Sequence, residues 1–224
     1  MILHALAALL LLVPAHARPP APGKRPPAKA ERKSPSVDAL IEGLQTSWDA
    51  AKTYQAKFQQ VVTSKRLGTR DETRGTLFVV KPSHLRWESE TDGGFQIMSE
   101  KKLTVVHKNR RGTVVVDLYP DLGKVMDPRP LAFLSGRVKF KDLYTIDLVS
   151  ETPDAATVRF VTRGTPNDAL VAEIDKKSYF LRSLTSETLE STVRTEFTGV
   201  RTNIELGEAL FEYKPGSGDI IHRN

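Results

Sequence analysis

Few side chains in this sequence could perform chemistry. Its 224 residues contain five histidines and no cysteine, which excludes thiol catalysis, zinc held by cysteine and structural disulfides. Beyond the first seventeen residues the histidines are His84, His107 and His222. No two of them have the spacing of metal ligands, and the HExxH motif does not occur. We therefore expect neither a metal site nor a cofactor.

No motif in the sequence indicates an enzyme. The GxSxG nucleophile motif and the phosphate-binding P-loop are both absent. The carboxylate pairs Glu88/Glu90 and Asp117/Asp121 are typical of charges on the solvent face of a strand rather than of an acid–base pair. We therefore do not expect catalysis. A hydrolase triad made of residues that are far apart in sequence remains an alternative.

The N-terminal segment is typical of a secretory signal. Residues 5–13 form an unbroken apolar run that ends at Pro14, and Ala15-His16-Ala17 fits the pattern that signal peptidase accepts. The run is shorter than the about 20 apolar residues that a spanning helix needs. We predict a cleavable signal peptide over residues 1–17 and export to the periplasm. Because no cysteine follows Ala17, we expect an exported product without a lipid anchor.

Residues 18–36 carry most of the net charge. Six Lys and Arg residues stand against one acid, Glu31, giving this segment +5 of the formal net charge of +6. Six prolines fall in the same stretch, so we predict a disordered, basic, Pro-rich linker. It is a spacer or a contact for anionic lipid headgroups. A nucleic-acid-binding domain would carry its basic residues on a folded face, so we expect no nucleic-acid partner.

Residues 37–224 are predicted to form one mainly β domain of the α+β type. Apolar residues recur at three- and four-residue spacing from Val37 to Ala51, which predicts an amphipathic helix. About ten later segments alternate apolar and polar residues, and turn signals separate most of them. This pattern predicts a large antiparallel sheet that curls, with a second short helix around residues 130–135.

The most informative stretch is Gly75–Trp87, GTLFVVKPSHLRW. It has a glycine, an apolar strand, a basic residue before proline, and a strand ending in tryptophan. In this it resembles the LolA family, periplasmic carriers of outer-membrane lipoproteins. The segments Tyr54–Gln60, Tyr144–Leu148 and Leu210–Ile221 resemble the family's first strand, a mid-domain strand and the closing segment. The likeness covers residues 37–222 in matching order.

The resemblance implies a fold and a task. The fold is a curved antiparallel half-barrel sheet of about eleven strands, with short helices forming a lid over an apolar concave cavity. The task is to shield the acyl chains of lipoproteins, since each CH₂ group moved into water costs about 0.8 kcal/mol. The expected partners are acylated lipoproteins as cargo, an ATP-driven releaser in the inner membrane and a receptor in the outer membrane. We expect a monomer that meets membranes only transiently.

Candidate lining residues follow from the predicted faces. From the sheet they are Phe58, Leu77, Val79, Leu85, Trp87, Phe95, Ile97, Leu103 and Val105, and from the lid Leu131, Phe133 and Leu134. The alternative for each is a place in a closed core. The resemblance also implies that Lys81 latches the lid. The family often has arginine there, and lysine donates fewer and less rigid hydrogen bonds. The alternative is an ordinary surface lysine before a turn.

Two other functions remain open at this point. One is an envelope lipid-binding or sensor module with the same architecture and a protein partner. The other is an envelope hydrolase whose catalytic residues come together only in the fold. An apolar cavity on the concave side of the sheet favours the carrier, and a packed core does not.

Overall fold

A computed structural model describes residues 35–99, 101–122, 133–135, 139–164 and 169–224. The predicted signal peptide and residues 18–34 of the predicted linker lie outside this part. The first described element is the helix α2 (Pro35–Ala50), which begins within the segment that we expected to be linker. Its Asp38 lies in the first turn, where a negative charge favours the helix dipole.

Twelve strands form a single sheet. In chain order they are β1 (Thr53–Ser64), β2 (Arg70–Val80), β3 (His84–Ser89), β4 (Phe95–Ser99), β5 (Lys102–Lys108), β6 (Val114–Tyr119), β7 (Tyr144–Glu151), β8 (Ala155–Thr162), β9 (Ala169–Asp175), β10 (Leu181–Glu187), β11 (Ser191–Thr202) and β12 (Ile220–Arg223). Their order across the sheet is β12-β6-β5-β4-β3-β2-β1-β11-β10-β9-β8-β7.

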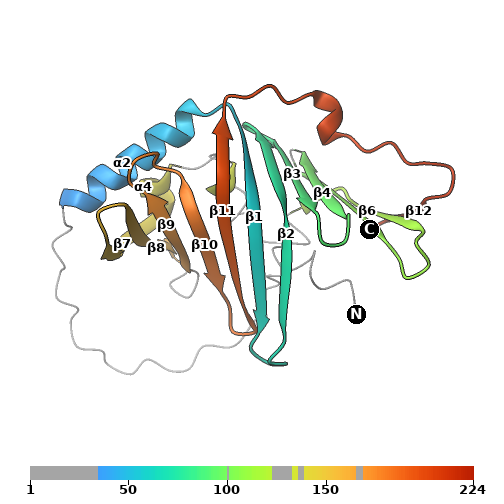
Figure 1. The fold of residues 1–224 in the computed structure, drawn as a ribbon, viewed down its shortest axis with the longest axis horizontal. Coiled ribbons are helices and arrows are strands. Elements are labelled where there is room, and N and C mark those ends of the chain that lie inside the picture. Colours follow the sequence, from blue (N-terminus) through green and yellow to red (C-terminus); the bar gives the residue numbers. More distant parts are fainter. Residues whose placement is uncertain (1–34, 100, 123–132, 136–138, 165–168) are drawn as a thin grey trace.

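The sheet consists of two meanders joined in the middle. Neighbouring strands are antiparallel except β12, which runs parallel to β6. The long strands β1 and β11 pair with each other, so an early and a late segment of the chain meet at the centre (Figure 1). Because β1 also pairs with β2, side chains from both halves converge on β1.

The helices pack on one face of this curved sheet. The short helix α4 (Phe140–Leu143) precedes β7 and contacts α2, and α2 lies over the β7–β10 side of the sheet (Figure 1). Apolar side chains of α2, residues 133–134 and α4 join those of the strands in one core. The predicted curved sheet with a helical lid is thus confirmed, with twelve strands in place of about eleven. We call α2, residues 133–135 and α4 the lid, and the sheet face beneath them the inner face.

The opposite, outer face of β3 and β4 is covered by the C-terminal segment. After β11 the chain crosses these strands through the 3₁₀ helix η2 (Glu208–Phe211) and returns as β12 (Figure 1). Arg86 donates to the Leu210 carbonyl at 3.1 Å, and Phe95 meets the ring of Tyr213 at 5.7 Å. This part of the sheet is therefore buried on both faces.

Candidate functional site

The amphipathic helix α2 turns its apolar stripe toward the inner face. Leu44 and Trp48, one turn apart, are 0% and 2% exposed, and both belong to the core shared with the sheet. The polar side carries Asp38, Glu42 and Asp49, whose carboxylates are exposed. The three- and four-residue spacing therefore reports which side of α2 faces the sheet.

Most of the predicted lining residues share this core. The sheet contributes Phe58, Leu77, Val79, Leu85, Trp87 and Leu103 as buried members, with Val105 packed against them. Phe133 and Leu134 join from the lid, with exposures of 0% and 1%. The predicted Leu131 lies outside the described residues.

Phe95 and Ile97 are the exceptions. Register pairs Leu85 with Met98 and Arg86 with Ile97; Leu85 and Met98 belong to the core beneath the lid, whereas Ile97 does not. The Arg86 guanidinium lies 3.8 Å from the centre of the Phe95 ring, on the outer face. Their assignment to the lining is corrected accordingly: β4 turns Gln96 and Met98 inward and Phe95 and Ile97 outward, where Tyr213 of the C-terminal segment packs on Phe95.

A small cavity lies between α2 and the middle of the sheet. Its lining consists of Trp48, Tyr54, Ala56, Leu77, Leu134, Phe180, Leu181, Phe197 and Val200. Its volume is about 10 Å³, which is room for about one water molecule. Among the described residues, side chains of the lid and the sheet pack around this cavity and leave it too small for an acyl chain.

Several of these lining residues were not predicted. Tyr54, Ala56 and Phe197 do fall on strand segments that the two-residue alternation identified, and Trp48 falls on the predicted helix stripe. Phe180 had no such signal, because it follows a turn. It reaches the cavity through long-range contacts with Trp48 and Tyr54, at ring-centroid distances of 5.2 and 6.4 Å.

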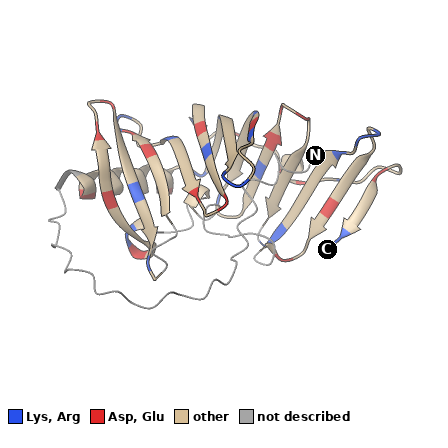
Figure 2. Ribbon diagram, turned by 90° about the horizontal axis from the view of Figure 1, so that it is seen from below, with Lys and Arg blue, Asp and Glu red and all other residues tan. Residues whose placement is uncertain are grey.

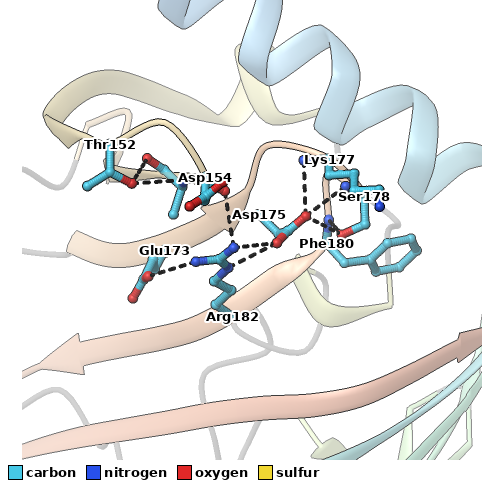
Figure 3. Close-up of polar contacts among 9 residues, drawn as sticks. Thr152, Asp154, Glu173, Asp175, Lys177, Ser178, Phe180 and Arg182 are labelled. Atoms are coloured by element: carbon cyan, nitrogen blue, oxygen red, sulfur yellow. Dashed lines mark hydrogen bonds and ion pairs between the residues drawn. The ribbon is translucent and has the colours of Figure 1, made fainter.

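The turn between β9 and β10 holds Phe180 and its neighbour Tyr179 against α2. Asp175 accepts hydrogen bonds from the backbone N–H groups of Lys177 and Ser178 at 3.0 and 2.8 Å and from Arg182 at 2.6 Å (Figure 3). These bonds, those from Ser178 first and then Arg182, lower the pKa of Asp175 to about 2. The turn is thus fixed by a carboxylate that stays ionised at any ordinary pH.

Tyr179 is held by this turn in an uncommon conformation. Its φ is 57°, a left-handed value that is rare for a bulky residue. The ring lies directly on Gly43 of α2, where an added Cβ would come within 2.4 Å of it. Gly43 therefore allows α2 to approach the turn closely, and the turn clasps the middle of the lid helix.

Charged residues join the two helices of the lid at its exposed edge. Lys139 lies 2.6 Å from Asp49, and Lys141 lies 2.9 Å from Glu42. The backbone N–H of Phe140 also donates to the Gln45 side-chain oxygen at 3.0 Å. The Lys139 contact lowers the pKa of Asp49. Exposed pairs of this kind are weak and screened by salt, so they align the lid without locking it.

Two histidines of the described part lie beside one carboxylate. His222 Nδ1 lies 2.9 Å from the Asp117 carboxylate, and His107 Nδ1 lies 3.6 Å from its second oxygen. Among the described residues no group of three or more His, Asp or Glu side chains could hold a metal ion, and no helix is long and apolar enough to cross a bilayer. Basic and acidic residues are interspersed over the strands of the described part (Figure 2).

Comparison with known proteins decides the family. The model of the family described as "Outer membrane lipoprotein carrier protein LolA" matches residues 49–214, more than half of the chain. The chain belongs to the LolA family. An outer-membrane lipoprotein carrier protein of Coxiella burnetii is 29% identical over 182 residues, covering 76% of this chain and 81% of the relative. One from Methylococcus capsulatus is 24% identical over 176 residues, covering 78% and 83%.

The fold also has a counterpart among solved structures. An uncharacterized conserved protein from Thermus thermophilus superposes with a TM-score of 0.52, at 12% identity, over 84% of this chain and 99% of that one. At this identity the match supports the architecture alone. The solved protein therefore shares the open, curved sheet with this chain of the LolA family.

The structure explains why the motif Gly75–Trp87 begins with glycine. A Cβ on Gly75 would lie 1.8 Å from the Glu88 carbonyl oxygen and 2.8 Å from the Phe58 ring. The glycine lets Phe58 of β1 reach Trp87 of β3 across the intervening strand, with ring centroids 4.1 Å apart. Aromatic pairs at this separation contribute about 0.5–1.5 kcal/mol beyond burial.

The basic residue of the same motif contacts the lid. The Lys81 ammonium donates to the Trp48 carbonyl in the last turns of α2 and lies 5.2 Å from the centre of the Trp48 ring. Burial lowers the pKa of Lys81, and the nearby Asp49 carboxylate opposes that change. The side chain is half-buried, so Lys81 is not an ordinary surface lysine.

Proposed function

We propose that this protein is a periplasmic carrier that shields lipoprotein acyl chains between the lid and the inner face and moves them from the inner to the outer membrane. The observation that carries the proposal is an apolar interior shared by α2 and the sheet, closed by a lid with weak exposed contacts. Membership of a lipoprotein carrier family supports it, and it also supports a role without catalysis. The predicted signal peptide supports the periplasmic location.

Cargo enters in this proposal by exchange with lid side chains. The cavity of about 10 Å³ among the described residues cannot hold an acyl chain, so in this proposal the lid moves away from the sheet. The apolar chains then occupy the space that lid side chains vacate and restore the lost apolar contact. Because such contact is non-directional, the grip can be strong and still reversible.

The partners follow from the same proposal. An ATP-driven releaser in the inner membrane supplies the acylated lipoprotein, and a receptor in the outer membrane accepts it. A receptor must offer the chains a better apolar site, because a carrier that only binds tightly cannot deliver.

The proposal is tested with spheroplasts that hold a labelled, outer-membrane-directed lipoprotein and a matched releaser. Adding the exported protein is expected to bring labelled lipoprotein into the soluble fraction, because the carrier keeps the acyl chains out of water. Bovine serum albumin serves as the control for nonspecific lipid binding. If folded protein releases no more label than buffer does, the carrier function is wrong.

We further propose that Lys81 is the latch of the lid. In Lys81→Met the ammonium is lost while most of the side-chain bulk remains, and the last turn of α2 should exchange its amide hydrogens about fivefold faster, equivalent to about 1 kcal/mol. Lys81→Arg is the matched control and should keep or increase protection, because a guanidinium donates in a more rigid geometry. Equal exchange in Lys81→Met and the wild type would remove the latch role.

A further inference from the structure

Trp48 lines the cavity and carries a buried hydrogen-bond donor without a partner among the described residues. Its side chain is 2% exposed and lines the cavity under α2. The indole Nε1–H has no acceptor in the part of the chain that the structure describes. A buried donor without a partner costs about 1–3 kcal/mol, and a phenylalanine could fill much of the same space without that cost.

The neighbours of Trp48 do not use this donor. Its ring is packed by the rings of Tyr54 and Phe180, at centroid distances of 5.1 and 5.2 Å. The Tyr54 hydroxyl donates to the Leu134 carbonyl, and burial raises the pKa of this phenol, so its proton stays in that bond. The remaining lining residues have hydrocarbon side chains. Trp48 is therefore the available donor among the residues that line the cavity.

The position of Trp48 suits a contact that persists when the lid moves. Trp48 lies in the last turn of α2, and the chain beyond it is tied to the sheet. The backbone N–H of Lys52 donates to the Asn203 side chain at 2.8 Å, and that of Lys81 donates to the Lys52 carbonyl at 2.9 Å. These bonds and the proposed Lys81 latch hold the Trp48 end of α2 near the sheet, while the far end of α2 can swing outward.

We propose that the Trp48 indole N–H donates a hydrogen bond to the carbonyl oxygen of an acyl ester or amide, so that the cavity selects carbonyl-linked acyl chains over plain alkyl chains. The inference rests on the proposed carrier function and deepens it by naming the ligand chemistry. Hydrocarbon alone leaves the donor unpaired, whereas the linkage of an acyl chain brings an acceptor with it. Discrimination of this kind is large because the penalty of the unpaired donor adds to the lost bond.

The test compares two fluorescent glycerol lipopeptides that carry chains of the same length. In one probe the chains are joined to glycerol by ester linkages, and in the other by ether linkages. The wild-type protein should bind the ester probe about tenfold more tightly, which corresponds to about 1.4 kcal/mol. In Trp48→Phe the preference should fall to about onefold, chiefly because the ester probe binds less well. Tyr213→Phe is the control, since Tyr213 lies on the outer face against Phe95 and bonds to Asp219, and it should keep the preference.

A spectroscopic readout reports the bond itself. The chain has two tryptophans, so ¹⁵N-indole labelling gives two N–H resonances, and Trp48→Phe assigns them. The Trp48 resonance should move downfield with the ester probe and not with the ether probe. Equal affinity of the wild type for both probes overturns this inference and leaves the carrier function standing. Failure to bind either probe overturns the carrier function as well.

Discussion

Crosslinking α2 to the β9–β10 turn is expected to abolish uptake of a triacylated lipopeptide. In the closed protein the cavity is about 10 Å³, and the acyl chains need the volume now filled by lid side chains. Gly43 and Tyr179 are in direct contact, so a short link between these positions holds the middle of α2 on the sheet. We expect the affinity to fall at least 100-fold, because the loss comes from exclusion rather than from a weakened contact.

The experiment benefits from the absence of cysteine in the chain. Gly43→Cys and Tyr179→Cys together give two unique thiols, and a short, cleavable bis-maleimide joins them without requiring disulfide geometry. The double variant before crosslinking and Tyr179→Cys treated with the reagent are the controls, and both should bind the lipopeptide; Gly43→Cys alone is not a control, because its Cβ would meet the Tyr179 ring. Cleaving the linker should restore binding.

The outcome separates two ways in which the protein could hold lipid. If the crosslinked protein binds the lipopeptide as tightly as the same variant does before crosslinking, the acyl chains do not enter beneath the lid. The interior shared by α2 and the sheet would then be an ordinary core, and the carrier would need another binding surface.

Much of this arrangement could be predicted from local pattern. The helix stripe that includes Leu44 and Trp48 and the alternation through Leu77, Leu85 and Trp87 were correctly interpreted. In those segments one face contacts the core and the other is more polar, so the alternation records the direction of burial. The family resemblance supplied the lid, which periodicity alone does not predict.

The prediction from the sequence was wrong on β4, where both faces of the strand are covered and neither is distinctly polar. On β4 Phe95 and Ile97 point outward, with Phe95 under the C-terminal segment, while Gln96, only 2% exposed, turns toward the inner face. Over these three residues the apolar side chains lie outside and the polar one inside, so the period of two is intact and its phase is reversed. The covering segment follows more than a hundred residues later, so no local window around β4 contains the information.

The site itself depends on contacts of the same long-range kind. Trp48 and Phe180 are more than a hundred residues apart in sequence, and their packing depends on the turn that Asp175 and Arg182 fix. A left-handed conformation is usually indicated by glycine or asparagine at the position, and here the residue is Tyr179. Its conformation follows from the fold around it, which a single sequence does not display.

The second large expected effect is a difference in cargo crosslinking between the two faces of the β3–β4 pair. Trp87 lies in the core beneath the lid, and Phe95, on the neighbouring strand, lies under the C-terminal segment. A photoreactive p-benzoylphenylalanine introduced at either position replaces one aromatic ring with another. In the carrier account the acyl chains contact the inner face only, so just one of the two variants should crosslink to cargo.

The most direct measurement is therefore irradiation of these two variants after each has been loaded with a radiolabelled, triacylated lipoprotein. Circular dichroism first confirms that both are folded. We expect a strong protein–lipoprotein adduct from position 87 and a yield at least tenfold lower from position 95. Adducts of equal strength from both positions, or an adduct from position 95 alone, would contradict the claim that acyl chains travel beneath the lid.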